Sequence, residues 1–225
     1  MKYGIMGAMP DEVDQLCARL SGVEVQQYAG VEYHQGRLGD KEVVVCCAGM
    51  GKANAAATTQ VLCGKFGAQA IIFSGIAGNM SEEIGIGDVV VGKEVCYHDA
   101  EVSMICQSAP FLKSYTGDPA LVQAALDACA ALGVKAIAGR IATGDTFVGD
   151  GATKAVIAEK VHPDCVEIEG AAVSQIAARN GVPCVVLRAM SDNADESGHE
   201  LLVVKKFSIA EYVTTATAIV ARMLE

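Results

Sequence analysis

Runs of Val, Ile and Leu with few polar interruptions recur along the chain, and stretches with helical periodicity lie between them. Strands of this kind are buried on both faces, as when helices cover both sides of a sheet. The predicted strands are Lys2–Ala8, Val43–Ala48, Ala70–Ser74, Val89–Val91, Val134–Ala138 and Cys184–Arg188. The predicted helices are Asp11–Leu20, Lys52–Phe66, Pro119–Leu132, Ala152–Lys160, Gly170–Asn180 and Phe207–Leu224.

This alternation predicts an α/β fold: a single three-layer domain over residues 1–225, with a central mixed, largely parallel twisted sheet flanked by helices. Hydrophobic residues make up 52% of the 225, which allows a large core or additional surface buried in an oligomer. The irregular stretch from Cys96 to Asp118 is either a long excursion that serves a site or an interface, or an ordinary surface loop.

The charge balance excludes some partners. The formal net charge is −10, and Lys and Arg form no cluster, so we expect neither nucleic acid nor an anionic membrane surface as a partner. The chain begins with the strand-like KYGIMGA rather than a signal segment, and no apolar run is long enough to span a bilayer. These features predict a cytoplasmic protein.

The nine cysteines form no Cys-x-x-Cys pair and mostly lie in apolar runs, so we expect reduced, buried thiols rather than disulfides or a metal site. Histidine is equally uninformative. His98 has a suggestive setting in YHDAEV, but the chain has no His-x-x-x-His and no Gly-x-Ser-x-Gly. Zinc-peptidase and Ser-His-Asp hydrolase chemistry are therefore set aside.

Two glycine-rich segments, AGMGKANAA and SGIAGN, are expected between a strand and a helix. They fit tight turns, and they also fit the strand ends at which α/β sheets bind ligands. Glu12 follows the first predicted strand and could simply favour the first turn of a helix.

Charged residues in two apolar segments are more informative. Glu167 and Glu169 interrupt CVEIEGAAV, and buried carboxylates are costly without partners. Arg188 and Asp192 follow the strand in VVLRAMSD, where α/β folds place their chemistry. Capping by Glu169 or Asp192, or a structural pair of Arg188 with Glu167, would each explain part of this pattern. Together the four residues suggest a site.

Eight segments, in this order, resemble the purine nucleoside phosphorylase/uridine phosphorylase superfamily, and within it the 5′-methylthioadenosine/S-adenosylhomocysteine nucleosidases. The resemblance covers nearly the whole chain, and the last two segments are the most diagnostic. The segments are GAMPDEV, AGMGKANAA, SGIAGN, IGDVVVG, YHDAEV, TGDTFV, VEIEGAAV and RAMSDNAD.

The resemblance implies hydrolysis of the N-glycosidic bond of 5′-thio-substituted adenine nucleosides. Asp192 matches the acid that assists departure of adenine at N7, and Glu12 matches the residue that activates water. Glu169 matches the residue that binds the ribose hydroxyls and favours an oxocarbenium-like transition state. The division of roles parallels glycoside hydrolysis.

The resemblance also implies a set of substrate-binding residues. Phe147 stacks on adenine, the Val148 backbone reads its amino group, and Ser191 lies near the base. Ile168 packs under the ribose, and Arg188 borders the water site. The full implied set is Met9, Met50, Ala77, Gly78, Val102, Phe147, Val148, Glu167, Ile168, Arg188, Ser191 and Phe207, of which Met9, Met50, Val102 and Phe207 line the apolar 5′-thio pocket. The resemblance implies no metal, no cofactor and a homodimer.

Some positions depart from the family pattern. Ile76 stands where several relatives have Ser near the water, and Ile168 replaces the usual Met between the two glutamates. Ile105 and Gln107 replace frequent aromatics directed at the neighbour's 5′ pocket, and Asn79–Met80 replaces a pair of small residues. The preferred 5′ substituent therefore stays open.

Three alternative functions remain. A phosphorylase of this fold would need cations for phosphate, but GAMPDE and AIIFSG contain no Arg, and Glu12 would repel the anion. A nucleosidase for another 5′-modified adenine nucleoside, such as aminodeoxyfutalosine, is the second. A non-catalytic nucleoside-binding protein is the third, and retention of all three acidic residues argues against it.

Overall fold

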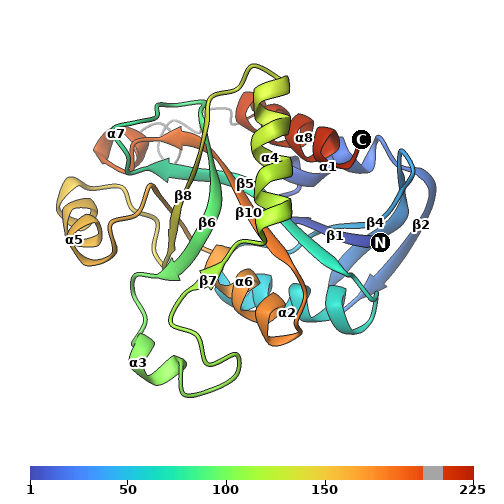
Figure 1. Cartoon of the computed structure of the whole chain (residues 1–225), viewed down its shortest axis with the longest axis horizontal. Coiled ribbons are helices and arrows are strands. Elements are labelled where there is room, and N and C mark those ends of the chain that lie inside the picture. Colours follow the sequence, from blue (N-terminus) through green and yellow to red (C-terminus); the bar gives the residue numbers. More distant parts are fainter. Residues whose placement is uncertain (200–209) are drawn as a thin grey trace.

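The computed structural model describes residues 1–199 and 210–225 (Figure 1). Its strands are β1 (Lys2–Gly7), β2 (Ser21–Tyr28), β3 (Val31–Leu38), β4 (Lys41–Cys47), β5 (Ala70–Asn79), β6 (Val89–Tyr97), β7 (Tyr115–Thr116), β8 (Ala136–Thr143), β9 (Cys165–Glu167) and β10 (Cys184–Asp192). Its helices are α1 (Asp11–Cys17), α2 (Lys52–Gly64), α3 (Val102–Ile105), α4 (Pro119–Ala131), α5 (Gly151–Val161), α6 (Gly170–Arg179), α7 (Glu196–His199) and α8 (Ala210–Leu224).

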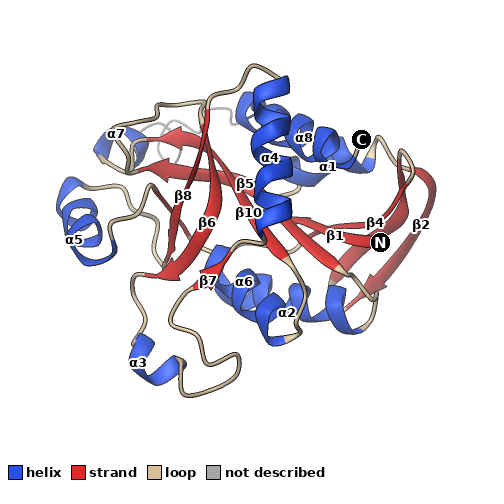
Figure 2. Cartoon of the chain, in the orientation of Figure 1, coloured by secondary structure: helices blue, strands red, loops and turns tan. Residues whose placement is uncertain are grey.

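The strands form one sheet that closes partly on itself. Its order is β10-β6-β8-β9-β5-β1-β4-β3-β2, and β7 pairs with β6. Because β10 also pairs with β5, the strands β5, β9, β8, β6 and β10 form a closed ring, from which β1, β4, β3 and β2 extend (Figure 2). The core of the fold is therefore a five-stranded barrel.

The mixed α/β fold is as predicted, but the largely parallel sheet is not. Among the strand pairs of residues 1–199 and 210–225, five are parallel and five antiparallel. The antiparallel pair of β10 and β6 closes the barrel by joining segments almost a hundred residues apart. Both strands are apolar runs, and such a run carries no information about its partner or its direction.

Neighbouring residues of the central strands pack against opposite helix layers, as strand geometry requires. Ile5 and Ile72 join the core under α1, α4 and α8, whereas Met6 and Phe73 join the core over α2 and α6. Figure 1 shows these two groups of helices on opposite sides of the strands. This double coverage explains why β1 and β5 are continuous apolar runs.

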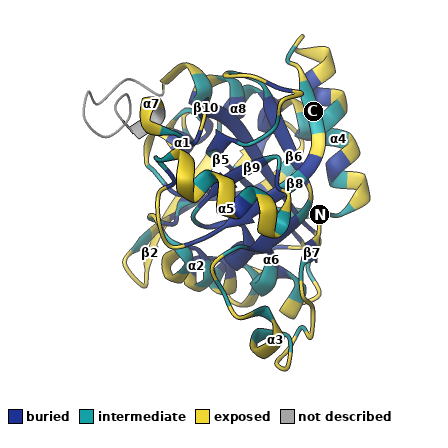
Figure 3. Cartoon of the chain, turned by 90° about the vertical axis from the view of Figure 1, so that its left-hand side faces the viewer, coloured by how far each residue is buried: buried dark blue, intermediate teal, exposed yellow. Residues whose placement is uncertain are grey.

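The hairpin of β2 and β3 has no counterpart among the predicted strands. Every residue of β2 is exposed, so it lacks the apolar pattern that marks a buried strand. α5 is also peripheral, with only Ile157 buried, and Figure 3 shows it on the outside of the barrel strands. Within the described ranges, no helix is both long enough and apolar enough to cross a membrane.

Candidate functional site

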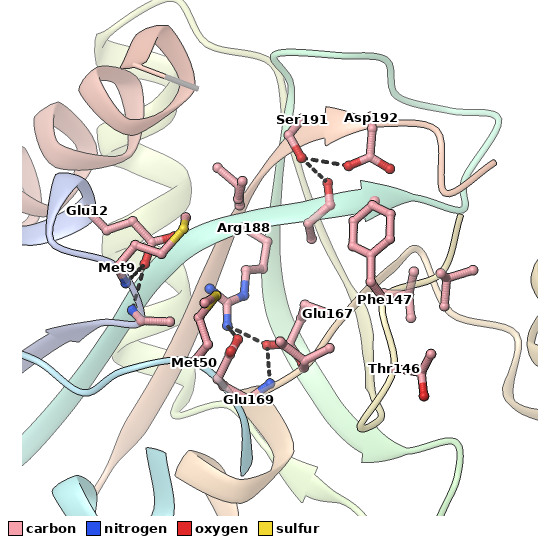
Figure 4. Close-up of a pocket in the computed structure, with 17 residues that line it drawn as sticks. Met9, Glu12, Met50, Thr146, Phe147, Glu167, Glu169, Arg188, Ser191 and Asp192 are labelled. Atoms are coloured by element: carbon pink, nitrogen blue, oxygen red, sulfur yellow. Dashed lines mark hydrogen bonds and ion pairs between the residues drawn. The ribbon is translucent and has the colours of Figure 1, made fainter. Parts of the chain in front are cut away.

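A cavity of about 390 Å³ opens where several strands end (Figure 4). Segments that follow β1 and β4 contribute Met9 and Met50, and the end of β5 contributes residues 76–78. The segment after β8 contributes Thr146–Val148, while β9 and β10 supply most of the charged side chains. Strand ends are the usual ligand site of α/β sheets, and the charged residues in the sequence predicted a site there.

The cavity brings together most of the residues predicted from the sequence. They are Met9, Glu12, Met50, Ala77, Gly78, Phe147, Val148, Glu167, Ile168, Glu169, Arg188, Ser191 and Asp192. Val102, at the start of α3, does not line it, and Phe207 lies outside the described residues. Four further lining residues were not predicted as site residues: Ala8, Ile76, Thr146 and Val166.

Glu12 turns back over the start of its own helix. Its Oε2 accepts hydrogen bonds from the backbone N–H groups of Ala8 at 2.6 Å and Met9 at 2.9 Å. The side chain is buried in the cavity wall, and loss of solvation raises its pKa, opposed chiefly by the positive charge of Arg188. Glu12 therefore lies in the first turn of α1, and its carboxylate binds the segment that precedes the helix and faces the cavity.

Arg188 is the central charge of the cavity. Its side chain is 1% exposed, stacks on the Phe73 ring at 4.3 Å, and donates from Nη2 to Glu167 and, at 3.4 Å, to Glu169. No acceptor for its Nε is present among the described residues. The attraction between this buried guanidinium and the neighbouring carboxylates offsets the free energy lost when these charges are removed from water.

Glu167 takes both of the roles that the sequence left open, because it pairs with Arg188 and caps α6, whereas capping by Glu169 is not observed. Glu167 accepts from the backbone N–H groups of Glu169 at 3.1 Å and Gly170 at 2.7 Å, and from the Thr143 hydroxyl, so it caps the start of α6. Glu169 occupies the N-cap position, but its side chain makes no capping bond. Instead it accepts from the Gly51 N–H, at the start of α2, at 2.9 Å.

This arrangement leaves Glu169 buried next to other charges. Its pKa is raised to about 7 by loss of solvation, with Arg188 opposing the shift and Glu167 adding to it. A carboxyl group in this condition changes its charge near neutral pH and is a candidate for chemistry.

Asp192 ends β10 and is held by its immediate neighbours. Ser191 Oγ lies 2.8 Å from Oδ2 of Asp192, and the Ala194 N–H donates to Oδ1, also at 2.8 Å. α7 begins only at Glu196, so Asp192 is not its N-cap. In Figure 4, Asp192 and Glu12 lie at opposite sides of the cavity, with Arg188 and Glu169 between them.

The glycines of SGIAGN make room for these side chains. The segment belongs to β5 and not, as expected, to a loop before a helix. A Cβ atom at position 75 would lie 2.1 Å from Nη1 of Arg188 and 2.7 Å from Oε1 of Glu12. At position 78 it would lie 3.0 Å from Oδ1 of Asp192. Here glycine permits close approach of charged groups to the strand.

The segment that carries Phe147 is fixed by an ion cluster beside the cavity. Lys52 Nζ lies 3.0 Å from carboxylate oxygens of both Asp99 and Asp145, and the Asp145 N–H donates to Asp99 at 2.7 Å. Lys52 directly follows Gly51, which binds Glu169. The cluster therefore couples the segment that carries Phe147 to the side of the cavity that holds Glu169.

Within the described residues, no group of three or more His, Cys, Asp or Glu side chains could hold a metal ion. The polar groups of the cavity instead suit an uncharged or weakly polar molecule. One guanidinium is already engaged by carboxylates, and further carboxyl groups stand at both sides.

Comparison with known proteins agrees with this description. The family model of the phosphorylase superfamily matches residues 2–225. A 5′-methylthioadenosine/S-adenosylhomocysteine nucleosidase of Shewanella sediminis is 41% identical over 201 residues, 87% of each chain. The S-adenosylhomocysteine nucleosidase of Streptococcus pyogenes, solved with 5-methylthiotubericidin, is similar with a TM-score of 0.92 at 34% identity, covering 100% of this chain and 96% of that one.

A futalosine hydrolase of Helicobacter pylori is also similar, with a TM-score of 0.88 at 29% identity, covering 100% of this chain and 97% of that one. The superfamily match spans nearly the whole sequence, and a curated relative exceeds 40% identity over most of both chains. This chain therefore belongs to the phosphorylase superfamily and, within it, to the family of 5′-methylthioadenosine/S-adenosylhomocysteine nucleosidases.

Proposed function

We propose that the chain hydrolyses the N-glycosidic bond of 5′-thio-substituted adenine nucleosides, namely 5′-methylthioadenosine and S-adenosylhomocysteine, and releases adenine and the 5′-thioribose. The observation that carries this proposal is the presence of Glu12, Glu169 and Asp192 in one cavity, with the positive charge of Arg188 already engaged by carboxylates. The reaction needs no metal and no cofactor.

Asp192 acts as the acid at the base end of the cavity. By donating a proton or a hydrogen bond to N7 it allows neutral adenine to leave, since the adenine anion is a poorer leaving group than neutral adenine. Phe147 stacks on the base, the Val148 backbone reads the amino group, and Ser191 holds the Asp192 carboxyl. Ala77 and Gly78 form the floor on which the base lies.

Glu169 acts on the sugar. Its carboxylate binds the ribose hydroxyls, and its negative charge is most stabilising when the ring becomes an oxocarbenium-like cation. Ile168 packs under the ring, while Glu167 holds Arg188 and the start of α6 in place. The hydrogen bond from the Gly51 N–H to Glu169 Oε1 helps to hold the Glu169 carboxylate in the cavity.

Glu12 activates the attacking water. Burial raises its pKa, which makes its carboxylate a stronger base. A phosphate dianion would instead face Glu12 across a desolvated cavity, where like charges repel strongly.

The test is to measure adenine release from 5′-methylthioadenosine with and without inorganic phosphate and to identify the sugar. A phosphate-independent rate with free 5-methylthioribose as product is expected, and Glu12→Gln should abolish most of it. A strict need for phosphate, with a phosphorylated sugar as the product, would place the chain among the phosphorylases. Absence of any turnover would make it a nucleoside-binding protein.

The similarity to futalosine hydrolase supports one further candidate, a nucleosidase for another 5′-modified adenine nucleoside such as aminodeoxyfutalosine. The cavity favours the thioether substrates because its 5′ side is built by the apolar side chains of Met9 and Met50. Burying one extra methyl-sized group is worth about 10–200-fold in kcat/KM. 5′-Methylthioadenosine should therefore surpass adenosine, and a panel of 5′-substituted adenosines would rank the candidates.

We also propose that the chain forms a homodimer in the cytoplasm. The segment around α3 projects from the body of the molecule in Figure 3 and exposes Met104, Phe111 and Leu112 by 68%, 69% and 43%. Exposed apolar side chains gathered on one segment are typical of an interface. The nine cysteines are free, which suits a reducing compartment.

A further inference from the structure

We propose that Lys154 is the positioning residue for Asp192: its ammonium group ties the ends of β5 and β10 together one residue beyond the last strand pair and so fixes the catalytic acid. The inference rests on the proposed function, in which Asp192 protonates the base. Lys154 lies on α5, outside the cavity, and does not touch the substrate space.

Asp192, the proposed acid, lies at the very end of the strand pairing. Asp192 pairs with Gly78 as the last pair of β10 and β5, after a register shift between Met190 and Asp192. The chain then leaves the sheet through Asn193 and through Ala194, whose φ of +52° is in the left-handed region. Strand pairing therefore constrains the backbone up to Asp192 but not the residues that follow it.

Lys154 supplies the missing constraint. Its Nζ donates to the carbonyl of Asn193 at 2.5 Å and to the carbonyl of Asn79 at 3.2 Å. These two carbonyls directly follow Asp192 and Gly78, so a single ammonium group bridges both strands at the point where their ladder ends. Hydrogen bonds from a charged donor are about twice as strong as neutral ones.

The same helix connects the acid to the segment that contacts the base. α5 begins three residues after Val148, and the N–H of Gly151, at its start, donates to Glu196 Oε1 at 3.0 Å. Only Ile157 of α5 is buried, so these polar contacts carry a large share of the attachment of the helix. α5 thereby holds the Phe147–Val148 segment and the Asp192 turn at a fixed separation.

The expected consequence is a loss of catalysis rather than of binding. Misplacing a catalytic group by about 1 Å can cost on the order of 10²-fold in rate. Lys154→Met should lower kcat for 5′-methylthioadenosine by about tenfold or more, within the roughly 10²–10⁴-fold that general acid assistance supplies, and leave KM within about twofold. Lys154→Arg, which keeps charged donors, should restore most of the rate.

The matched control is Lys135→Met. Lys135 Nζ also donates to a carbonyl, that of Glu83, at 2.5 Å, but it lies away from the cavity. Its loss should leave kcat unchanged. Thermal unfolding of each variant separates a local effect from a loss of folding, and Lys154→Arg reports on the site if Lys154→Met proves unstable.

A 4-nitrophenyl riboside shows whether Lys154 works through the acid, because that leaving group departs without a proton. Lys154→Met should lose far less activity on this substrate than on 5′-methylthioadenosine. Equal losses on both substrates, or a kcat within about twofold of wild type on 5′-methylthioadenosine, would overturn the inference. Asp192→Asn, measured in parallel, distinguishes the two levels: if it too retains the wild-type rate, the proposed acid itself is wrong.

Discussion

Gly75 and Arg188 are paired across β5 and β10, and the guanidinium of Arg188 occupies the space that a side chain at position 75 would need. A Cβ atom there would lie 2.1 Å from Nη1 of Arg188 and 2.7 Å from Oε1 of Glu12. The absence of one methyl group thus allows a cation and an anion to approach the same strand from the cavity side.

Gly75→Ala is therefore expected to displace Arg188 and Glu12 together. We expect kcat/KM to fall by about 10²-fold or more, because groups displaced by about 1 Å lose most of their catalytic effect. Gly85→Ala is the matched control, since a Cβ atom at position 85 meets nothing within 4 Å. Steady-state kinetics of both variants would test this, and a Gly75→Ala enzyme as active as Gly85→Ala would contradict it.

The raised pKa of Glu169 leads us to expect that activity depends on pH. Its pKa of about 7 means that the carboxylate needed at the ribose forms only as pH rises through neutrality. We expect kcat/KM, which reports on the free enzyme, to rise between about pH 6 and 8, and Glu169→Gln to lower the rate and remove that rise.

The same group affects stability in the opposite sense. Between the unfolded pKa of 4.5 and the folded value of about 7, the native state binds more protons, so its stability falls as pH rises through this window. Glu169→Gln should reduce that fall. Urea unfolding of both proteins at pH 5 and pH 8 would measure it, and identical pH trends would refute the assignment.

Arg188→Met should destabilise the fold strongly at neutral pH. It removes the cation that lies between Glu167 and Glu169, both nearly fully buried, and breaking such a buried pair costs about 3–5 kcal/mol. Arg222→Met is the control, because its partner Glu225 is exposed and such surface pairs are worth about 0–1 kcal/mol. Denaturant unfolding compares the two, and equal losses would show that Arg188 is not the central counter-charge.

The exposed segment around α3 predicts the oligomeric state. Sedimentation at micromolar concentration should give the mass of a dimer, and Phe111→Asp should shift it towards the monomer with a loss of activity. Val25→Asp, at a similarly exposed apolar residue on β2, should leave the dimer intact. A monomeric and fully active wild-type protein would rule out the proposed assembly.

The sequence was most informative where burial left a regular pattern. β1, β5 and β10 were found because both of their faces are covered, whereas β2 is exposed throughout and gave no such signal. Closure of the barrel depends on the pairing of β10 with β6, and no local pattern specifies so distant a partner. SGIAGN was expected to be a loop because glycine usually breaks strands.

The candidate site was predicted chiefly through motif resemblance and through buried charge. Glu167, Glu169 and Arg188 stood out as polar residues in apolar runs. Ala8 and Val166 could not stand out, since they contribute only surface to the cavity. The role of Lys154 could not be predicted either, because a lysine on an exposed helix is ordinary until its two carbonyl partners are known.

The ring of strands has a consequence for how securely the charged residues are placed. Arg188 is flanked by Gly75 of β5 on one side and Val90 of β6 on the other. A slide of β10 by a single residue would break hydrogen bonds to both neighbours at once. It would also turn Leu187 into the cavity and bury the guanidinium among the apolar side chains beneath α4 and α8. Pairing on both sides of β10 therefore fixes the register of this strand, and that register keeps Arg188 on the cavity side.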